Sequence, residues 1–597
     1  MCGIIGAVTN NPLLFKRFNS FLVDMEHRGP DGIGSMKVKV GDKSYLFGHT
    51  RLAIQDLSID SNQPFTKHNK TILFNGEIYN KSELKTEFFN NGTHKFQTNS
   101  DTEVLLEILH YFGLDGLSKL SGMFAFALFD HIEKTLLLVV DRFGIKPLYY
   151  SIEGQNVFFS SDINSIWKMR SKNDLNIEYF NRNIYLDHFI GFTQETPFKG
   201  IDLLSPGSYL IFKDDNVEIK KYYDISNISF GHTLENEENL ASLFETSVKN
   251  HLISDVAIGC NLSGGFDSSL IAVFASKYNA AIKFLSVNPN VSIEDKHSDL
   301  FYSKFLYDFV SSETSSYHNV SFEESWSLSS IDRFVTSLGT PIYDDRVVVW
   351  NALYSYAKKS GVKVVLNGQG ADELWYGYYP KIWRWFSNLF HEQLDIESVS
   401  NYINKQLKSS AIGQSLNCSK KLQTKYNEEL YHRIKCSTNE LNDHKQLTCF
   451  MINSVLPSLL KFEDSISMLN SVEVRVPFLD HKLVEYALSM PSQTHLQCTF
   501  QGKDYLKKVF RNHLPIEIIE RTKKPLPKGD LNNDTINNLF LTNINELKNS
   551  DLIGKLYDRS KLAALLQLRD QNGFYGRPKE AMLQILTTWR FEKLFCG

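Results

Sequence analysis

Cys2 carries the first side chain in this sequence whose position gives it unusual chemistry. If Met1 is removed, the thiol stands beside a free α-amine with a pKa of about 7.7–8.0, which can accept a proton at neutral pH. One residue then supplies both nucleophile and base, as covalent catalysis by an amino-terminal thiol requires. Taken alone, Met-Cys fits an accident of initiation equally well, so the motifs that follow have to decide.

Four later motifs meet the needs of amide hydrolysis through a thioester. They are HRGPDGIG, GHTRLAI, NGEIYN and SDTE, at residues 27–34, 48–54, 75–80 and 100–103. The side chain of Asn75 and the backbone amide of Gly76 can stabilise the oxyanion of a tetrahedral intermediate. A free amino acid needs a guanidinium for its carboxylate, which Arg51 offers, and carboxylates for its ammonium, which Glu77 and Asp101 offer.

In this order, and with cysteine at position 2, these motifs resemble the class II glutamine amidotransferases. The match continues through DRFGIKPLYY and FSSD, at residues 141–150 and 159–162, so it covers most of the first 220 residues. The resemblance implies that Cys2 attacks the carboxamide of glutamine while Asn75 and Gly76 hold the oxyanion. It also implies that Arg51, Glu77 and Asp101 bind the amino-acid end of glutamine, with ammonia and glutamate as products.

A glycine-rich loop, SGGFDSS at residues 263–269, follows the apolar run VAIGCNL and precedes a helical segment. Its backbone amides and the helix N-terminus suit a phosphate group, and Asp267 suits Mg²⁺ bound to a polyphosphate. It lacks the GK[ST] ending of a Walker loop, and a simple serine-glycine turn is the plain alternative. The loop resembles the pyrophosphate-binding loop of the ATP pyrophosphatase group, which implies adenylation of an acceptor and release of pyrophosphate.

Two further segments narrow this interpretation. In GVKVVLNGQGADELWYGY, at residues 361–378, a buried strand leads to Asp372 and Glu373, which could complete a Mg²⁺ shell with Asp267. The segment EDSISMLNSVEVRVPFLDHKLVEYAL, at 463–488, is followed by basic residues. Lys507 and Lys523 are candidate cations for the leaving pyrophosphate, although solvated surface lysines are an equally plain interpretation of Lys523.

Together with the glutaminase motifs, these segments resemble the glutamine-hydrolysing asparagine synthetase family over nearly the whole chain. The resemblance implies an α/β protein of two domains, with an αββα Ntn-hydrolase sandwich at residues 1–228. Residues 236–597 are then a helix-rich α/β ATP-pyrophosphatase domain, similar to the adenine nucleotide alpha hydrolases. ATP and Mg²⁺ are the implied cofactors, with the metal on Asp267 and Asp372. The residues expected at the nucleotide are Leu262, Ser263, Gly264, Gly265, Asp267, Ser268, Ser269, Val287, Asn367, Gly368, Lys507 and Lys523.

Local patterns in the sequence favour the same division of the chain. Short alternating or apolar runs dominate residues 3–220, with helix-like stretches near 13–26, 80–90 and 102–112, which predicts sheets covered by a few helices. Beyond residue 238 a strand, a glycine-rich turn and long helices follow one another, which predicts parallel strands. The boundary is expected near residues 225–238.

Composition limits the classes of protein and partner. The chain has 597 residues, four times a domain of about 150, with 42% hydrophobic and 22% charged residues, so a disordered or fibrous protein is excluded. A net charge of −4 without basic blocks argues against nucleic acid, and no apolar run approaches the ~20 residues that span a membrane. Seven scattered cysteines predict reduced thiols, and a cytoplasmic location is expected. Small-molecule substrates, namely glutamine, ATP and a carboxylate, are what the family resemblance implies. A homodimer is left open.

Two departures from the family pattern concern the acceptor. Gln369 stands where GEGSDE of the best-known bacterial asparagine synthetases has glutamate, and an amide cannot take a proton from attacking ammonia. Tyr376 replaces the first glycine of the usual ELFGGY. The default acceptor is aspartate; a dedicated acid of polysaccharide or secondary-metabolite synthesis is the alternative, and a silent binding protein is a third. Aromatic residues beyond Glu373 suit either a stacking wall for a larger acid or ordinary helix packing.

Overall fold

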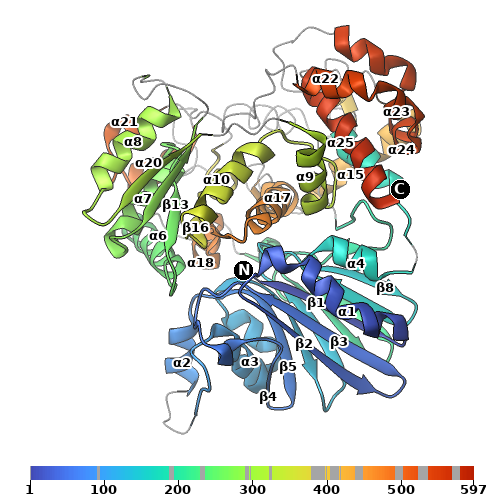
Figure 1. Ribbon diagram of the computed structural model, residues 1–597. Coiled ribbons are helices and arrows are strands. Elements are labelled where there is room, and N and C mark those ends of the chain that lie inside the picture. The colour runs from blue at the N-terminus through green and yellow to red at the C-terminus, as the bar shows by residue number, and fades with distance from the viewer. Residues whose placement is uncertain are drawn as a thin grey trace.

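The computed structural model describes most of the chain and divides it into two parts (Figure 1). The first part, residues 2–228, lies below in Figure 1, and the second begins at Asn236. The structure does not describe residues 1, 90–93, 172, 187–193, 229–235, 289–294, 296–297, 322–325, 378–396, 398–399, 402, 404–415, 417, 437–447, 491–501, 522–534, 568–577 and 597.

Two six-stranded antiparallel sheets stack against each other in the first part. The first sheet has the order β10-β8-β9-β1-β3-β2, formed by Asp202–Leu203, Tyr149–Glu153, Asn156–Ser160, Gly3–Thr9, Lys43–Arg51 and Gly32–Val40. The second has the order β12-β11-β7-β6-β5-β4, formed by Asn216–Lys221, Ser208–Lys213, Thr135–Val140, Gly122–Asp130, Lys70–Ile78 and Phe65–Lys67. The facing sides share an apolar core that includes Phe47 and Phe129.

Helices cover the outer faces of both sheets. α1 (Pro12–Asp24) and α4 (Ile163–Met169) pack on the first sheet, and α3 (Asp101–Phe112), joined by α2 (Lys81–Phe89), packs on the second. The αββα sandwich expected from the sequence is therefore confirmed. The three predicted helical stretches in this part correspond to α1, α2 and α3.

The second part contains a five-stranded parallel sheet in the order β15-β14-β13-β16-β17. Its strands are Ser316–Val320, Lys283–Val287, Ile258–Asn261, Val364–Leu366 and Glu473–Arg475. The chain runs outward to one side from β13 and then returns to β16 on the other side. In such doubly wound sheets ligands bind at the carboxyl ends of the two strands where the order reverses. The loops after β13 and β16 are therefore the expected binding site.

Many helices accompany this sheet in the upper part of the molecule, as the sequence predicted (Figure 1). They are α5 (Ile177–Leu186), which comes from the first part, α6 (Glu237–His251), α7 (Phe266–Tyr278), α8 (Asp299–Val310), α9 (Leu328–Leu338), α10 (Val347–Lys359), α11 (Ala371–Leu374), α15 (Lys420–Cys436), α17 (Leu456–Leu469), α18 (His481–Ser489), α20 (Asp504–Val509), α21 (Ile516–Ile519), α22 (Thr535–Thr542), α23 (Ile544–Asn549), α24 (Asp551–Leu556) and α25 (Pro578–Cys596). Helices α22–α25 form a separate group beyond α9 (Figure 1). Among the described helices, none has the length and apolarity needed to cross a membrane.

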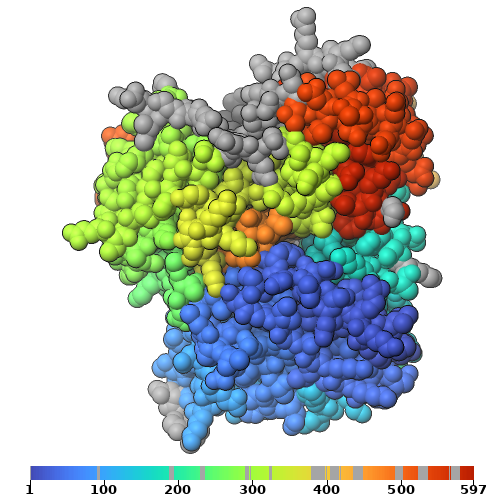
Figure 2. Space-filling view, viewed as in Figure 1, coloured from blue at the N-terminus to red at the C-terminus, as the bar shows by residue number. Residues whose placement is uncertain are grey.

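The two parts pack directly on each other (Figure 2). An apolar core cluster runs without a break from the outer side of the first sheet into the second part. Buried charges also cross the boundary: Arg28 Nη2 lies 3.0 Å from Asp464 Oδ2, and both side chains are less than 5% exposed. The beginning of β1, and with it Cys2, lies at this boundary (Figure 1).

Candidate active site

Cys2 and Asn75 meet at the amino-terminal end of β1. The backbone N–H of Cys2 donates to Asn75 Oδ1 at 2.9 Å, and its Sγ lies 4.0 Å from the carbonyl oxygen of Leu52. Asn75 is fully buried in β5, with its Nδ2 3.5 Å from Ser161 Oγ. Burial raises the pKa of the Cys2 thiol. A free amine on the same residue would supply the base that this buried thiol needs.

Gly76 follows Asn75 in β5 and brings the backbone unusually close to β6. A Cβ at this position would lie 2.6 Å from Phe124 Cα and would also collide with the carbonyl oxygen of Met123. Real Cβ atoms do not approach backbone so closely, so only glycine fits here. The structure thus places Asn75 beside Cys2, with Gly76, the other predicted oxyanion residue, next to Asn75 in the same strand.

The three residues predicted to bind glutamine are buried around the same region. Arg51 donates to the carbonyl oxygen of Ser58 at 2.7 Å and to Asn62 Oδ1 at 2.8 Å, and it forms no ion pair with a carboxylate among the described residues. Asp101 Oδ2 accepts the backbone N–H of Ile78 at 2.9 Å. Burial raises the pKa of Asp101.

Glu77 connects this region to the second part. Its carboxylate accepts a hydrogen bond from Gln55 and lies 3.1 Å from Arg475 Nη2. Burial raises the pKa of Glu77 to about 8, with Arg475 opposing the rise and Asp101 adding to it. The negative charges of Glu77 and Asp101 therefore act on each other inside the protein.

Arg475 is a fully buried residue of β17 and was not singled out from the sequence. Its guanidinium contacts Glu77 and also Glu473 Oε1 at 2.7 Å, and it donates to the carbonyl oxygen of His251 at 2.8 Å. The carbonyl oxygen of Arg475 accepts the N–H of Asn367 at 2.8 Å. One residue therefore contacts both the Cys2 region and the loop after β16.

Replacing Arg475 with glutamine is expected to lower the free energy of unfolding by about 3–5 kcal/mol, because Glu77 and Glu473 would lose their cation inside the protein. Chemical denaturation followed by tryptophan fluorescence measures the loss. Lys213→Gln is the control, since it breaks an exposed pair with Glu133 and is expected to change nothing measurable. Equal losses of unfolding free energy in the two variants would show that the buried guanidinium stabilises the protein no more than an exposed cation does.

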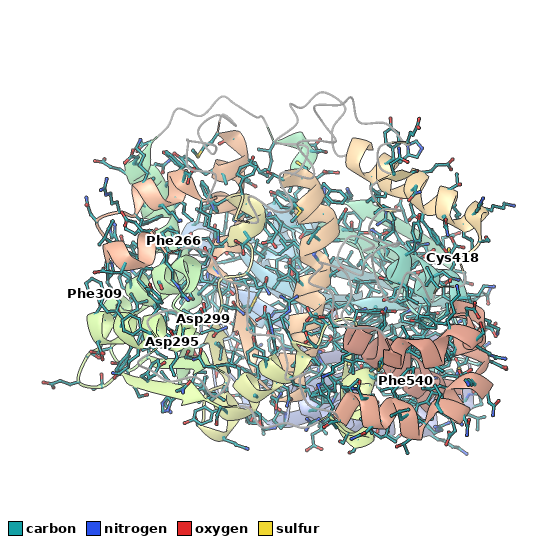
Figure 3. The ribbon with its side chains drawn as sticks, turned by 90° about the horizontal axis from the view of Figure 1, so that it is seen from above. Phe266, Asp295, Asp299, Phe309, Cys418 and Phe540 are labelled. Atoms are coloured by element: carbon teal, nitrogen blue, oxygen red, sulfur yellow. The ribbon has the colours of Figure 1, made fainter. Side chains whose placement is uncertain are left out.

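The loop after β13 turns tightly before α7. Ser268 Oγ donates to the carbonyl oxygen of Gly265 at 3.1 Å and lies 3.0 Å from Ser263 Oγ. Gly264 has φ +70°, and a Cβ there would lie 2.6 Å from the backbone nitrogen of Ser303 in α8. This loop is therefore pressed against α8; the first residues of α7 and α8, Phe266 and Asp299, lie on the same side of the molecule (Figure 3).

The other residues predicted at the nucleotide include three at the carboxyl edge of the sheet. Val287 ends β14, and Asn367 and Gly368 follow β16, so all three lie at the carboxyl edge of the sheet beside the loop. Leu262 and Ser269 are fully buried. Lys507 is half-buried in α20, and burial lowers its pKa. Lys523 lies outside the described residues.

Asp267 and Asp372 converge on one cation, the ammonium group of Lys503. Lys503 Nζ lies 2.6 Å from Asp372 Oδ1 and also donates to Asp267, and its side chain is only 5% exposed. No group of three or more His, Cys, Asp or Glu in the described part of the chain is arranged to hold a metal alone. Two carboxylates fit Mg²⁺, which completes its shell with water and phosphate oxygens.

Two basic residues of this site escaped sequence analysis. Lys503 is one helical turn before Lys507, and its backbone oxygen accepts the N–H of Lys507 at 2.8 Å. Arg521 Nη1 donates to the carbonyl oxygen of Gly264 at 2.7 Å, pairs with Asp299, and stacks 4.1 Å from the centre of the Tyr302 ring. No sequence spacing could have indicated Lys503 or Arg521, because the partners of both side chains lie more than 130 positions away in the chain.

The aromatic residues beyond Glu373 fall partly outside the described residues. Trp375 and Tyr376 are less than 4% exposed, and Tyr376 Oη accepts from Thr448 Oγ1 at 3.1 Å. Tyr376 has φ +60°, in the left-handed region that favours glycine, which explains why the related motif has glycine here. Both residues follow the end of α11 and are buried inside the protein, which favours packing over a stacking wall for these two.

Comparison with known proteins follows this division of the chain. A family model for a glutamine amidotransferase domain matches residues 1–223, and one for asparagine synthase matches residues 239–590, more than half of the chain. The chain belongs to the asparagine synthase family. Its relatives include asparagine synthetase (glutamine-hydrolyzing) 3 of Bacillus subtilis, 29% identical over 95% of this chain and 93% of the relative. Asparagine synthetase (glutamine-hydrolyzing) 1 of the same organism is 29% identical over 88% and 87%.

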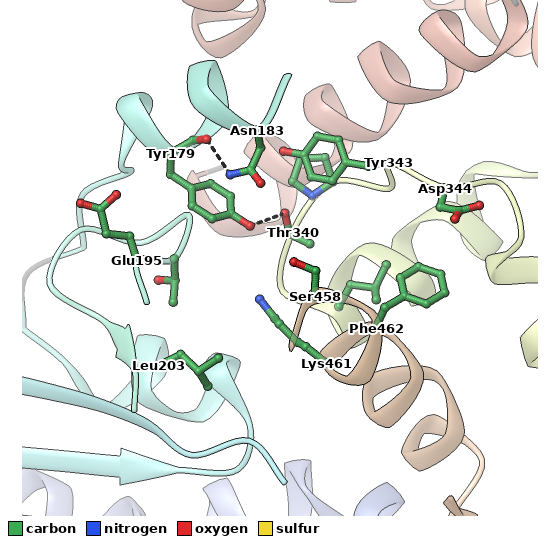
Figure 4. A pocket seen from close by; sticks show the side chains of 13 residues that line it. Tyr179, Asn183, Glu195, Leu203, Thr340, Tyr343, Asp344, Ser458, Lys461 and Phe462 are labelled. Carbon is green, nitrogen blue, oxygen red and sulfur yellow. Dashed lines mark hydrogen bonds between the residues drawn. The ribbon is translucent and has the colours of Figure 1, made fainter. Parts of the chain in front are cut away.

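The structure of this asparagine synthase family member also contains a pocket lined by 13 residues (Figure 4). It opens between α5 of the first part and α17 of the second, with Tyr179, Thr340 and Lys461 among its lining residues. Tyr179 Oη lies 3.5 Å from Thr340 Oγ1, and burial lowers the pKa of Lys461 to about 8. None of the predicted site residues lines this pocket.

Proposed function

We propose that the protein hydrolyses glutamine at Cys2 and uses ATP and Mg²⁺ to convert a carboxylate into its amide. The observation that carries this proposal is the presence of two sites in one chain. Cys2 lies beside Asn75 at the first site, and Asp267 and Asp372 come together at the second. Arg475 contacts both regions, which supports coupling of ammonia release to its use. The names of the relatives agree with this activity.

At the first site, Cys2 would attack the carboxamide carbon and Asn75 and Gly76 would hold the oxyanion. Arg51 would bind the α-carboxylate of glutamine, and Glu77 and Asp101 its α-ammonium group. The deep burial of both carboxylates supports this assignment, because a ligand cation would stabilise them. Ammonia would then pass inside the protein to the second site.

At the second site, the loop of residues 262–269 would bind the phosphates of ATP, with Val287, Asn367 and Gly368 around the adenosine. Asp267 and Asp372 would hold Mg²⁺, which neutralises charge on the leaving pyrophosphate. Lys503 lies against both carboxylates and would shift toward the phosphates when the metal binds. Lys507 and Lys523 remain proposed contacts of the pyrophosphate.

L-Aspartate is the proposed acceptor, and a different acid is the second candidate, favoured by Gln369 in place of glutamate. Conversion of ATP to AMP and pyrophosphate is the test, with purified protein, Mg²⁺ and one carboxylate at a time. We expect L-aspartate to raise pyrophosphate release well above the rate without acceptor. Release that responds only to sugar acids, peptides or other carboxylates would replace aspartate by the second candidate. No response to any carboxylate, and no ammonia from glutamine, would indicate a silent protein.

Three further statements stay proposals. The domain limits are 1–228 and 236–597, supported by the change from antiparallel to parallel sheets between β12 and β13. A cytoplasmic location rests on the cysteine usage, since the cysteines whose side chains are described are free thiols. A homodimer remains open to measurement by light scattering.

A further inference from the structure

Glu463 is a buried carboxylate of α17 that points at the second site. It is 1% exposed, and its Oε1 accepts from Tyr354 Oη of α10 at 2.5 Å. Asn367 Nδ2 donates to the same oxygen, and the amide of Gln369 also favours the ionised form of this carboxyl group. Glu463 is therefore held between α10 and the loop after β16, where the nucleotide and the acceptor are proposed to bind.

The charged neighbours of Glu463 do not neutralise it. Glu463 forms no ion pair among the described residues, although Lys146 lies close enough to lower its pKa. Lys146 itself donates to the carbonyl oxygen of Val474 at 3.3 Å, and Arg28 pairs with Asp464. Among the described residues, Lys146 and the hydroxyl of Tyr354 are the titratable groups that act most strongly on this carboxylate. A purely structural buried glutamate would be expected to have a paired cation.

The position of Glu463 also suits the direction from which ammonia would come. Its neighbour Asp464 binds Arg28, whose Nε lies 3.4 Å from the carbonyl oxygen of Cys2. Glu463 therefore lies on the side of the second site that faces the glutaminase region. Burial raises its pKa to about 8, close to the working pH of an intracellular enzyme, where a general base is most effective.

Formation of an amide from ammonia releases a proton that some group must accept. The nitrogen attacks the acyl carbon of the activated acceptor, the acyl–oxygen bond breaks with its electron pair leaving on oxygen, and the nitrogen loses one proton. Gln369 occupies the place of the glutamate in the related motif and its amide is not basic enough to take that proton. A different carboxylate is needed nearby.

We propose that Glu463 is the catalytic base of the amide-forming step, taking the proton that the attacking ammonia nitrogen loses. This proposal rests on the amide-forming function proposed above. Gln369, Asn367 and Tyr354 then act as positioning residues that hold the carboxylate. The two halves of the reaction depend on Glu463 differently, since activation of the acceptor releases pyrophosphate before any nitrogen attacks.

Glu463→Gln is the first test, with L-aspartate, ATP, Mg²⁺ and ammonium chloride. We expect exchange of pyrophosphate into ATP, which reports activation of the acceptor, to stay within about threefold of wild type. Amide formation should fall about 10²- to 10⁴-fold, the usual contribution of a general base. Loss of exchange together with amide formation would instead show that Glu463 supports the nucleotide site, and unchanged amide formation would overturn the proposal. No exchange in the wild-type protein would contradict the proposed function itself.

The dependence of the rate on pH separates a base from a structural group. In the wild-type protein, amide formation at saturating free ammonia should rise as the pH passes through about 8 and Glu463 loses its proton. Tyr354→Phe removes one donor to the ionised carboxylate, so the rise should move to higher pH while exchange is kept. A rise at the same pH in both proteins would contradict the assignment.

Infrared difference spectroscopy tests the same group without turnover. The wild-type protein should show a protonated carboxyl band that disappears as the pH is raised through about 8. Glu77 contributes a second band in the same range, because its pKa is also raised to about 8, and Glu77→Gln identifies that band. The remaining band should be absent from Glu463→Gln. If Glu463→Gln fails to fold, Glu77→Gln and Glu463→Asp, which keeps a shorter base, still decide: no titrating band other than that of Glu77 overturns the proposal.

Discussion

Replacing Cys2 with alanine is expected to reduce glutamine-driven amide formation by at least about 10⁴-fold, because no other group can form the thioester. Ammonia-driven formation should stay within about twofold, since the loops after β13 and β16 are untouched. Parallel assays with glutamine and with ammonium chloride measure both rates. Cys596→Ala, at an exposed thiol near the carboxyl end, is the matched control and should leave both rates unchanged.

The same experiment tests the processing of the amino terminus. Active protein should have a mass that lacks Met1, because a free amine on Cys2 would supply the base that this thiol, whose pKa is raised by burial, needs. Glutamine-driven turnover in Cys2→Ala, or active protein that retains Met1, would refute the mechanism at the first site.

Sequence analysis predicted the elements that carry most of the proposed site. Alternating apolar runs predicted the strands of the αββα sandwich, and the apolar runs before SGGFDSS and NGQGADE predicted β13 and β16. In a parallel sheet, loops after strands that adjoin where the order reverses meet at one edge, so Asp267 and Asp372 come together across more than 100 residues. The motifs therefore indicated both their elements and their shared location.

The residues that contact the predicted site residues from distant segments of the chain could not be predicted in the same way. Arg475 lies in β17, Glu463 in α17, and Lys503 directly before α20, and the local pattern of each segment describes only a strand or a helix. Their importance comes from burial beside residues that are 90 or more positions away, such as Asn367 beside Glu463. Neither hydrophobic period nor short motif spacing reports such pairs, because both describe only neighbours along the chain. Lys507 was selected from the sequence, whereas the structure places Lys503 against the two carboxylates.

Asp267→Asn is expected to reduce ATP-dependent amide formation with either nitrogen source by about 10³-fold or more. A metal ion contributes several kcal/mol of charge stabilisation to phosphoryl chemistry, and asparagine offers it a neutral ligand in place of a carboxylate. Pyrophosphate release at increasing Mg²⁺ concentration measures the loss, which should be partly relieved at high Mg²⁺.

Glutamine hydrolysis without ATP provides the internal control for Asp267→Asn, because Cys2 and Asn75 lie in the other part of the protein and should keep their activity. Asp308→Asn is the matched control in the same domain, since Asp308 is exposed on α8 and pairs with Lys304 of the same helix. Lys503 would keep Asp372 as a partner, so the variant should still fold. If Asp267→Asn and Asp308→Asn release pyrophosphate at equal rates, the two converging carboxylates do not hold the metal, and the second site has to be sought elsewhere in the chain.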